Sequence, residues 1–194
     1  MREHENSSVI ELLNLTKTFG SLAAVNNLSL SVSAGEVLGF LGPNGAGKTT
    51  TMRMLTGLIS PTSGTATIQR FDIHDRKPEM LAEIGYLPGT LSLYESMTAG
   101  DFFNFLARMR QRDCSDKIAD LADRLRLDLT PHIHELSKGN RQKVGVISAF
   151  IHEPTVLILD EPTSGLDPLM QREFEGMLEE VKTRGAAVLL SSHV

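Results

Sequence analysis

The sequence predicts an α/β fold with a mainly parallel sheet, and three observations lead to this prediction. Apolar runs of strand length alternate with longer stretches of helical periodicity along most of the 194 residues. Residues 156–159 are continuously apolar, which is typical of a strand buried on both faces. Residues 42–49 form a glycine-rich segment between an apolar run, residues 37–41, and a helical stretch. We expect helices on both faces of such a sheet.

The first half of the chain is predicted to consist mainly of strands. In residues 28–32, leucines and a valine alternate with serines, which favours a strand with one buried face. The other predicted strands in this half cover residues 9–14, 37–41, 65–69 and 84–87. The predicted turns cover residues 26–27, 34–35 and 61–64, where Asn, Gly, Pro and Ser gather.

The region after Pro88-Gly89 changes character and is predicted to be helical. Apolar residues at positions 102, 105, 106 and 109 recur at helical spacing, and residues 118–125 repeat the pattern after a break at 113–115. Further helices are predicted from near Ser137 to Ile151 and from Pro168 to about Lys182, with a last buried strand at residues 186–190. The apolar stripes are interpreted mainly as the core of a small helical subdomain, and part of one edge also suits a docking partner.

Composition narrows the class of protein. With 41% apolar residues, the chain is long enough to bury one sizeable core, so we expect one globular unit. The net charge of −5 argues against attraction of the whole surface to nucleic acid, but leaves room for a local basic patch. Cys114 is the only cysteine, which excludes an internal disulfide and favours a cytosolic protein. The sequence has no signal-peptide pattern and no apolar stretch of about 20 residues, so any membrane role is expected to act through a partner.

The glycine-rich segment matches the phosphate-binding loop pattern G-x-x-x-x-G-K-[ST]. Its residues are Gly42, Pro43, Asn44, Gly45, Ala46, Gly47, Lys48 and Thr49. The glycines let successive backbone N–H groups wrap around phosphate oxygens, and the following helix adds its positive N-terminal end. Lys48 is predicted to reach the β- and γ-phosphates, and the Thr49 hydroxyl to ligate Mg²⁺. The alternative is a glycine-rich loop that only caps a helix beside a surface lysine.

Chemically useful groups also follow two later strands, and ligands of open α/β sheets bind beyond the carboxyl ends of the strands. Asp160 and Glu161 follow the apolar run; Asp160 is predicted to support Mg²⁺ and Glu161 to polarise the attacking water. The segment Ser191-Ser192-His193 follows the last strand, and His193 is predicted to hydrogen-bond the γ-phosphate or the water. Alternatively, the acidic pair only ends a strand and caps a turn, and His193 is structural or exposed.

Residues 136–143, L-S-K-G-N-R-Q-K, resemble the L-S-G-G-Q signature of ATP-binding cassette (ABC) proteins. The order of phosphate loop, signature, acidic strand end, S-G-L-D at 164–167 and His193 is similar to that family over almost the entire chain. The resemblance implies a P-loop NTPase core, an N-terminal antiparallel β subdomain and a small α-helical subdomain. It implies one nucleotide-binding domain at residues 1–194, with the ATPase core and β subdomain at 1–84 and 154–194 and the helical subdomain at 85–153.

The resemblance also implies a role for each matching residue. Phe19 is the position that stacks on adenine, Glu161 is the catalytic glutamate, and His193 is the switch histidine, also counted as catalytic. Thr49 and Asp160 hold or support the metal. The implied ATP contacts are Phe19, Gly42, Pro43, Asn44, Gly45, Ala46, Gly47, Lys48, Thr49, Thr50, Ser137, Gly139, Asn140 and Asp167. Alternatively, Phe19 belongs to the core and Ser137 only caps its helix beside a solvated basic face.

The family resemblance implies a mechanism as well. Two nucleotide-binding domains dimerise head to tail, so that the signature of one chain, including Ser137, faces the ATP held by the other. ATP closes the dimer and hydrolysis lets it open, with Asp167 in the loop that communicates across the dimer. The implied cofactors are ATP and Mg²⁺, and the implied partners are a second copy and integral membrane subunits of an efflux-type transporter. The expected location is the cytoplasmic face of the cell membrane, and no nucleic-acid partner is expected.

Two departures from the family pattern leave alternatives open. Gly89 stands where the family usually has a glutamine, so no side chain is available there to contact Mg²⁺, water or a membrane subunit. The chain stops one residue after His193, which predicts a fragment whose strand at residues 186–190 lacks cover and exposes apolar surface. The alternatives are a degenerate module that binds ATP with little hydrolysis, and a soluble ABC ATPase that acts on ribosomes or DNA.

Overall fold

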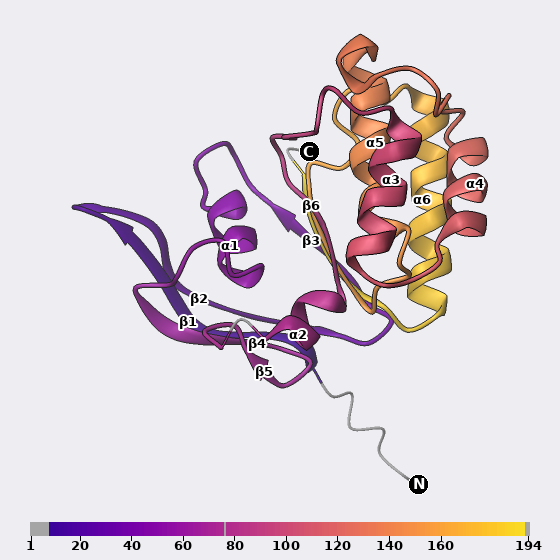
Figure 1. Ribbon diagram of the computed structural model, residues 1–194. Helices are drawn as coiled ribbons and strands as arrows, with labels where there is room; N and C mark the ends of the chain where they lie inside the picture. The colour runs from indigo at the N-terminus through magenta and orange to yellow at the C-terminus, as the bar shows by residue number, and fades with distance from the viewer. Residues whose placement is uncertain (1–7, 76, 193–194) are drawn as a thin grey trace, which may run out of the picture.

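The computed structural model describes residues 8–75 and 77–192 and contains two four-stranded sheets (Figure 1). One sheet is antiparallel, with the order β2-β1-β4-β5, and the other is parallel, with the order β3-β8-β7-β6. The strands are β1 (Ser8–Phe19), β2 (Leu22–Ser33), β3 (Val37–Leu41), β4 (Ser63–Ile68), β5 (Phe71–Asp72), β6 (Ile84–Leu87), β7 (Val156–Asp160) and β8 (Ala187–Ser192). The predicted α/β class with a parallel sheet is confirmed.

Six α-helices and one 3₁₀ helix connect the strands in the described part of the chain. They are α1 (Lys48–Leu55), α2 (Pro78–Ala82), α3 (Ala99–Met109), α4 (Ser115–Arg124), η1 (Ile133–Glu135), α5 (Lys138–Phe150) and α6 (Pro168–Thr183). The sequence patterns predicted all of these except α2, η1 and the two-residue strand β5. Elements of two to five residues span about one turn or one alternation at most, which is too short for a periodic pattern to be recognised. None of the described helices is long and apolar enough to cross a membrane.

The antiparallel sheet corrects one predicted turn. Asn26 and Asn27 do not form a turn but lie inside the 12-residue strand β2, and the hairpin turn lies at Gly20 and Ser21. The pairing runs from Leu15↔Leu28 to Lys17↔Val25, so β2 carries one extra residue there. Asn27 has a φ of 50°, a conformation that asparagine tolerates better than most residues. The pair therefore marks a β-bulge within a continuous strand.

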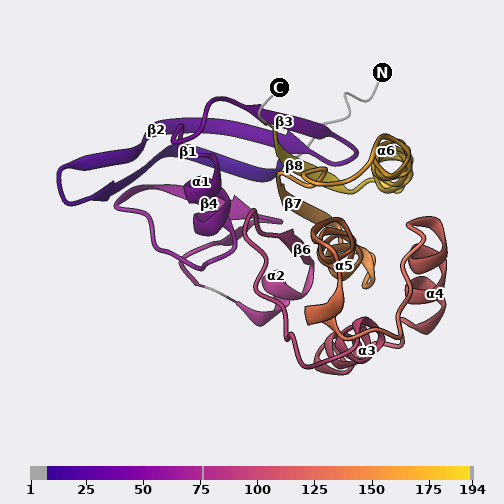
Figure 2. The same cartoon turned by 90° about the horizontal axis from the view of Figure 1, so that it is seen from above.

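The parallel sheet separates two hydrophobic clusters, and strand β7 contributes to both. Val156 and Ile158 pack into the cluster that includes α1 and the antiparallel sheet. Leu157 and Leu159 pack into the cluster formed with α3, α4, α5 and α6. All four side chains are fully buried. Successive side chains of β7 point to opposite faces of the sheet, so this strand packs against α1 on one face and against the cluster of α3, α4, α5 and α6 on the other (Figure 2).

The last strand is covered, which corrects the expectation of an exposed apolar surface there. Strand β8 lies between β3 and β7 rather than at the edge of the sheet. Ala187, Val188 and Leu189 are completely buried, and Ala186 is 4% exposed. Both neighbours of β8 and both hydrophobic clusters come from the residues that the structure describes, and together they bury this strand.

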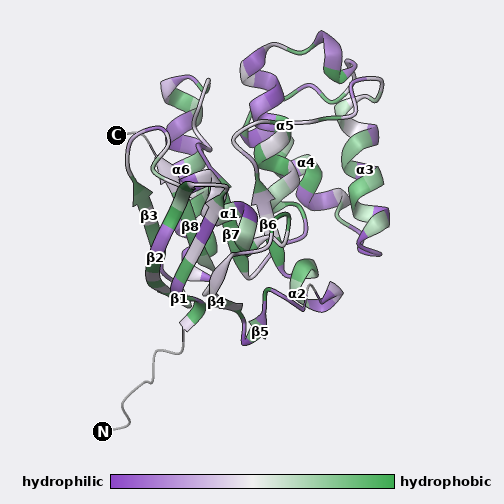
Figure 3. Cartoon of the chain, turned by 90° about the vertical axis from the view of Figure 1, so that its left-hand side faces the viewer, coloured by the Kyte–Doolittle hydropathy of each residue, from purple (hydrophilic) through white to green (hydrophobic). Residues whose placement is uncertain are grey.

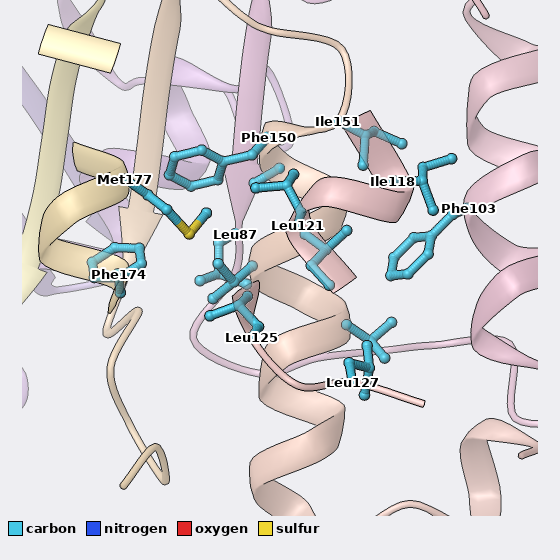
Figure 4. Close-up of a cluster of buried hydrophobic side chains, with 14 of the residues drawn as sticks. Leu87, Phe103, Ile118, Leu121, Leu125, Leu127, Phe150, Ile151, Phe174 and Met177 are labelled. Atoms are coloured by element: carbon cyan, nitrogen blue, oxygen red, sulfur yellow. The ribbon is translucent and has the colours of Figure 1, made fainter. Parts of the chain in front are cut away.

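The two predicted amphipathic helices are confirmed as α3 and α4, but the buried face of α3 differs from the predicted one. On α4, Ile118, Leu121 and the following Leu125 are buried as expected. On α3, Met109 is 67% exposed and Phe103, outside the expected stripe, is fully buried. Hydrophobic and hydrophilic residues alternate around α3 (Figure 3), and Figure 4 shows Phe103 pointing toward Ile118 of α4. The helices therefore pack mainly against one another, as the core interpretation predicted.

Candidate functional site

A pocket of about 350 Å³ opens where the glycine-rich loop joins β3 to α1. Its walls come from the ends of β1 and β2, from the loop itself and from the residue after β7. The lining residues are Phe19, Leu22, Ala23, Ala24, Asn44, Gly45, Ala46, Gly47, Lys48, Thr49, Thr50 and Glu161. The structure thus brings most of the predicted phosphate-loop residues, Phe19 and Glu161 into one cavity.

The loop is shaped so that backbone N–H groups face the pocket at the start of α1. Gly47 is the N-cap residue of α1, with a φ of 87° and no side chain to cap the helix. A Cβ atom on Gly47 would lie 2.3 Å from the carbonyl oxygen of Ala24, so a glycine is required there both for conformation and for space. No side chain of the described residues caps the N-terminal end of α1, so its amides and helix dipole would favour an anion bound in the pocket.

Lys48 is the first residue of α1 and is only 5% exposed. Its ammonium group donates hydrogen bonds to the carbonyl oxygens of Gly42 and Pro43, the latter at 3.0 Å. These contacts hold the charge over the loop, and phosphate oxygens would offer it stronger, charged acceptors. The position fits the role that the loop pattern predicted for Lys48.

The predicted metal residues lie side by side behind the loop. The Thr49 hydroxyl donates to Asp160 Oδ2 at 2.6 Å, although the two residues are 111 positions apart in the sequence. Asp160 is 1% exposed. A hydroxyl and a carboxylate are hard oxygen donors, and Mg²⁺ in nucleotide sites commonly takes one or two protein oxygens together with phosphates and water. The described residues contain no group of three or more His, Cys, Asp and Glu that could hold a metal ion. The oxygens of Thr49 and Asp160 fit Mg²⁺ that is bound together with a nucleotide.

Glu161 is held through its backbone, in a conformation unusual for a non-glycine residue. Its φ is 52°. Its N–H donates to Ser191 Oγ at 3.0 Å, and its carbonyl accepts from Gln142 Nε2 at 3.3 Å. Gln142 also donates to the carbonyl of Pro162 at 3.1 Å. Sequence reasoning missed both Ser191 and Gln142, although each lies within a motif that it had singled out.

The ends of the central strands meet as predicted. In the sheet register, Leu41 of β3 pairs with Ser192 of β8, and Asp160 of β7 pairs with Ser191. The phosphate loop, the acidic pair and the serine pair therefore leave the same edge of the sheet. His193 lies outside the described residues, and its predicted role stays a prediction.

Two further predictions concern residues at the rim of the pocket and behind it. Phe19 is 52% exposed, and the Lys17 ammonium lies 5.1 Å from its ring centroid. An exposed aromatic ring at the pocket mouth is suited to stack on a base. At the other side, a Cβ atom on Gly89 would lie 2.8 Å from Asp160 Oδ2. The loop after β6 therefore passes directly against the Asp160 carboxylate, which leaves no room for a longer side chain in this arrangement.

The remaining predicted contact residues form a separate group outside the pocket. Ser137 caps α5, where its hydroxyl accepts from the N–H of Asn140 at 3.2 Å. A Cβ atom on Gly139 would lie 2.9 Å from the carbonyl oxygen of Gly165, so the signature is packed against the S-G-L-D loop. Asp167 caps α6 by accepting from the N–H groups of Leu169 and Met170, each at 3.0 Å. None of Ser137, Gly139, Asn140 and Asp167 lines the pocket that holds the phosphate loop.

Comparison with known proteins identifies the family. A family model described as ABC transporter matches residues 25–164, which is well over half of the chain. The chain belongs to the ABC transporter family. Among its ABC relatives is the bacitracin transport ATP-binding protein BcrA of Bacillus licheniformis, which is 36% identical over 192 residues. This match covers 97% of the present chain and 62% of BcrA, so the chain spans about three fifths of that relative.

Solved ABC structures share the fold. The structure of an ATP-binding subunit of an ABC transporter matches with a TM-score of 0.89 and 30% identity, and the match covers 96% of this chain and 80% of that one. A bacterial ABC transporter cassette solved as a dimer matches with a TM-score of 0.86 and 23% identity, covering 95% and 88% of the two chains. These similarities confirm the P-loop cassette fold that the motifs predicted.

Proposed function

We propose that the chain is the ATP-binding and ATP-hydrolysing subunit of an ABC transporter that moves a substrate across a membrane, in the direction of export. The observation that carries the proposal is the pocket that is lined by both the phosphate loop and Glu161, with the Thr49–Asp160 hydrogen bond directly behind it. The phosphate loop supplies a site for phosphate groups, Thr49 and Asp160 supply oxygens for a cation, and Glu161 supplies a carboxylate next to both.

Each pocket residue has a task in this proposal. The amides at the start of α1 and the Lys48 ammonium bind the β- and γ-phosphates, while Phe19 stacks on the base. Thr49 and Asp160 would hold Mg²⁺, which neutralises phosphate charge and thereby favours attack on the γ-phosphate. Glu161 orients and polarises the attacking water through its carboxylate. The buried position of Asp160 keeps this arrangement in place between turnovers.

A second copy of the chain completes the site in this proposal. Ser137 and Asn140 belong to the cassette signature but lie outside the pocket of their own chain. Head-to-tail pairing of two chains supplies the signature of one to the nucleotide of the other. The N-terminal end of α5 then faces the γ-phosphate and adds its positive potential to the site. The similarity to a cassette solved as a dimer supports this assembly.

The proposed membrane partner has a suitable surface at the opposite end of α1 from the ATP pocket. A second cavity of about 330 Å³ lies between the end of α1, α2, β6 and α3. Its apolar lining consists of Leu58, Leu81, Ile84, Tyr86, Pro88, Leu91, Leu93, Phe102 and Leu106. Leu58 is 62% exposed and Leu81 38% exposed, which favours contact with an apolar segment of a membrane subunit. Co-purification with an integral membrane protein supports transport, whereas salt-sensitive binding to nucleic acid contradicts it.

Substitution of Glu161 tests the proposed hydrolysis. In the Glu161→Gln variant, steady-state ATP turnover should fall by about 10²- to 10⁴-fold, because the carboxylate that polarises water is lost. ATP binding should persist, and ATP should convert the variant into a dimer measurable by light scattering. Glu175→Gln on the exposed face of α6 is the matched control and should keep wild-type turnover. Wild-type protein that binds ATP without turnover would instead identify a binding module.

A further inference from the structure

The hydroxyl of Ser191 joins the two acidic residues of the site. Ser191 is the fifth residue of β8 and is 1% exposed. Its Oγ donates a hydrogen bond to Asp160 Oδ1 at 2.6 Å and accepts one from the N–H of Glu161 at 3.0 Å. A serine hydroxyl has a single proton to donate, so these two contacts assign that proton to Asp160 and a lone pair of the Ser191 oxygen to the N–H of Glu161.

Both contacts of Ser191 act on groups that need a fixed orientation. Asp160 receives Thr49 on Oδ2 and Ser191 on Oδ1, so both carboxylate oxygens are held and the carboxylate plane is defined. Glu161 has a φ of 52°, which costs free energy in a residue with a side chain and persists only where the surroundings enforce it. The Ser191 hydroxyl enforces it from the N–H side.

Gln142 of α5 holds the other side of Glu161. Its amide donates to the carbonyl oxygens of Glu161 and Pro162, at 3.3 and 3.1 Å. The backbone of Glu161 is therefore fixed by one residue from the central sheet and one from the signature helix. Ser191 differs from Gln142 because it alone of the two also contacts Asp160.

We propose that Ser191 is a positioning residue that sets the Asp160 carboxylate and the Glu161 backbone together, so that the cation and the attacking water are aligned by one hydroxyl. The inference rests on the proposed ATP hydrolysis, and it assigns a role to the strand end two residues before His193. Ser191 itself touches neither nucleotide nor water in this proposal.

Replacement of the hydroxyl tests the inference. Ser191→Ala should lower ATP turnover by about 10- to 100-fold, which is the usual effect of losing a group that orients a metal-site ligand. ATP affinity should change by less than about twofold, because the phosphate loop and Phe19 keep their contacts. Ser191→Thr retains the hydroxyl on a residue that suits a strand and should recover most of the lost turnover. Thr183→Ala, which removes a hydroxyl bonded only within α6, is the control and should retain wild-type turnover.

Cation affinity provides a readout that does not depend on turnover. Electron paramagnetic resonance can measure Mn²⁺ binding to the ATP complex, and Ser191→Ala should weaken it by about tenfold as Asp160 loses its orientation. Circular dichroism establishes that each variant is folded. If Ser191→Ala does not fold, Ser191→Thr decides alone: turnover and Mn²⁺ affinity within about threefold of wild type support the inference, and larger losses in a folded protein overturn it.

The outcomes separate this inference from the proposed function. If the wild-type protein hydrolyses ATP and the folded Ser191→Ala variant hydrolyses it at the same rate, the proposed role of Ser191 is overturned. The ATPase proposal is then unaffected. Equal losses in folded Ser191→Ala and Ser191→Thr also overturn it, because the hydroxyl is then not the cause. Absence of turnover in the wild type defeats the ATPase proposal, and the Mn²⁺ measurement then decides: unchanged affinity in Ser191→Ala rejects the positioning role.

Discussion

Gly47 precedes helix α1 and Gly176 lies inside helix α6, and the surroundings of the two glycines differ completely. Gly47 is the N-cap residue of α1 with a φ of 87°, and an added Cβ would lie 2.3 Å from the Ala24 carbonyl oxygen. Gly176 lies inside α6, and an added Cβ there would meet nothing within 4 Å. The same substitution is therefore expected to have opposite effects at the two positions.

Alanine substitution at these glycines tests the geometry of the phosphate loop. Gly47→Ala should destabilise the fold by about 2 kcal/mol or more, because it forces alanine into the left-handed conformation and brings its Cβ against the Ala24 carbonyl oxygen. ATP affinity measured by calorimetry should fall with it. Gly176→Ala should stabilise the protein by about 0.5–1 kcal/mol in urea unfolding, since alanine favours a helix interior. Equal effects of the two changes would contradict the loop geometry.

At the scale of single residues, local patterns predicted the phosphate loop well because its residues are consecutive. That Thr49 and Asp160 lie close together was predictable, since Thr49 follows the loop after β3 and Asp160 ends β7 at the same edge of the sheet. Ser191 was not predicted as a site residue, because its hydrogen bonds to Asp160 and Glu161 depend on the register between β7 and β8. The register between two parallel strands depends on how both strands pack, so the sequence around Ser191 alone did not reveal these contacts.

At the scale of elements, long periodic segments were predicted closely and interruptions were not. Helix α5 begins after Ser137, as its serine and apolar spacing indicated. Asn26 and Asn27 were misread as a turn because a β-bulge uses the same residue types as a turn. Helix α2 escaped detection because five residues provide little more than one helical turn.

Helices α4 and α6 are joined by a charged contact that no periodicity indicates. Arg124 at the end of α4 donates to Glu173 at 2.6 Å and to both carboxylate oxygens of Glu180 at 2.8 and 2.7 Å. The hydrogen bonds from Arg124 lower the pKa of Glu180 below its ordinary value. The guanidinium of Arg124 therefore ties the end of α4 to two different turns of α6.

A double-mutant cycle measures this contact. Arg124→Ala and Glu180→Ala should show a coupling energy of about 1 kcal/mol in urea unfolding, because the geometry is bidentate although Glu180 is partly exposed. The control is the pair Lys182 and Glu179 within α6, whose expected coupling is about 0.3 kcal/mol. Molar salt should reduce both values. A coupling no larger than that of the control would show that the fork geometry adds nothing.

At the scale of the whole molecule, His152 makes stability depend on pH. It follows α5, is 3% exposed, and its Nε2 lies 3.2 Å from the carbonyl oxygen of Ile84 in β6. Burial lowers the pKa of His152 to about 4, with a further contribution from Arg110. An unfolded histidine titrates near pH 6.5, so below about that pH the unfolded chain binds a proton that the folded chain excludes until about pH 4.

Stability should therefore fall as the pH is lowered from about 7 toward 4. Between pH 7 and pH 5, the free energy of unfolding should fall by up to about 2 kcal/mol because the unfolded chain binds a proton at His152 that the folded chain does not bind. His152→Gln keeps a side chain that can donate to Ile84 but does not titrate, so its unfolding free energy should vary less over the same interval. Urea midpoints at the two pH values provide the comparison. The prediction is wrong if the variant shows the full wild-type pH dependence.

Gly89 has a consequence for exchanging segments between members of the family. The space that a side chain at position 89 would enter is already filled by the Asp160 carboxylate, 2.8 Å from the site of its Cβ. A glutamine grafted at position 89 alone would displace either the loop after β6 or the acid that supports the cation. A side chain at position 89 and the orientation of the Asp160 carboxylate therefore depend on each other, and a graft that introduces glutamine must also change the surroundings of Asp160.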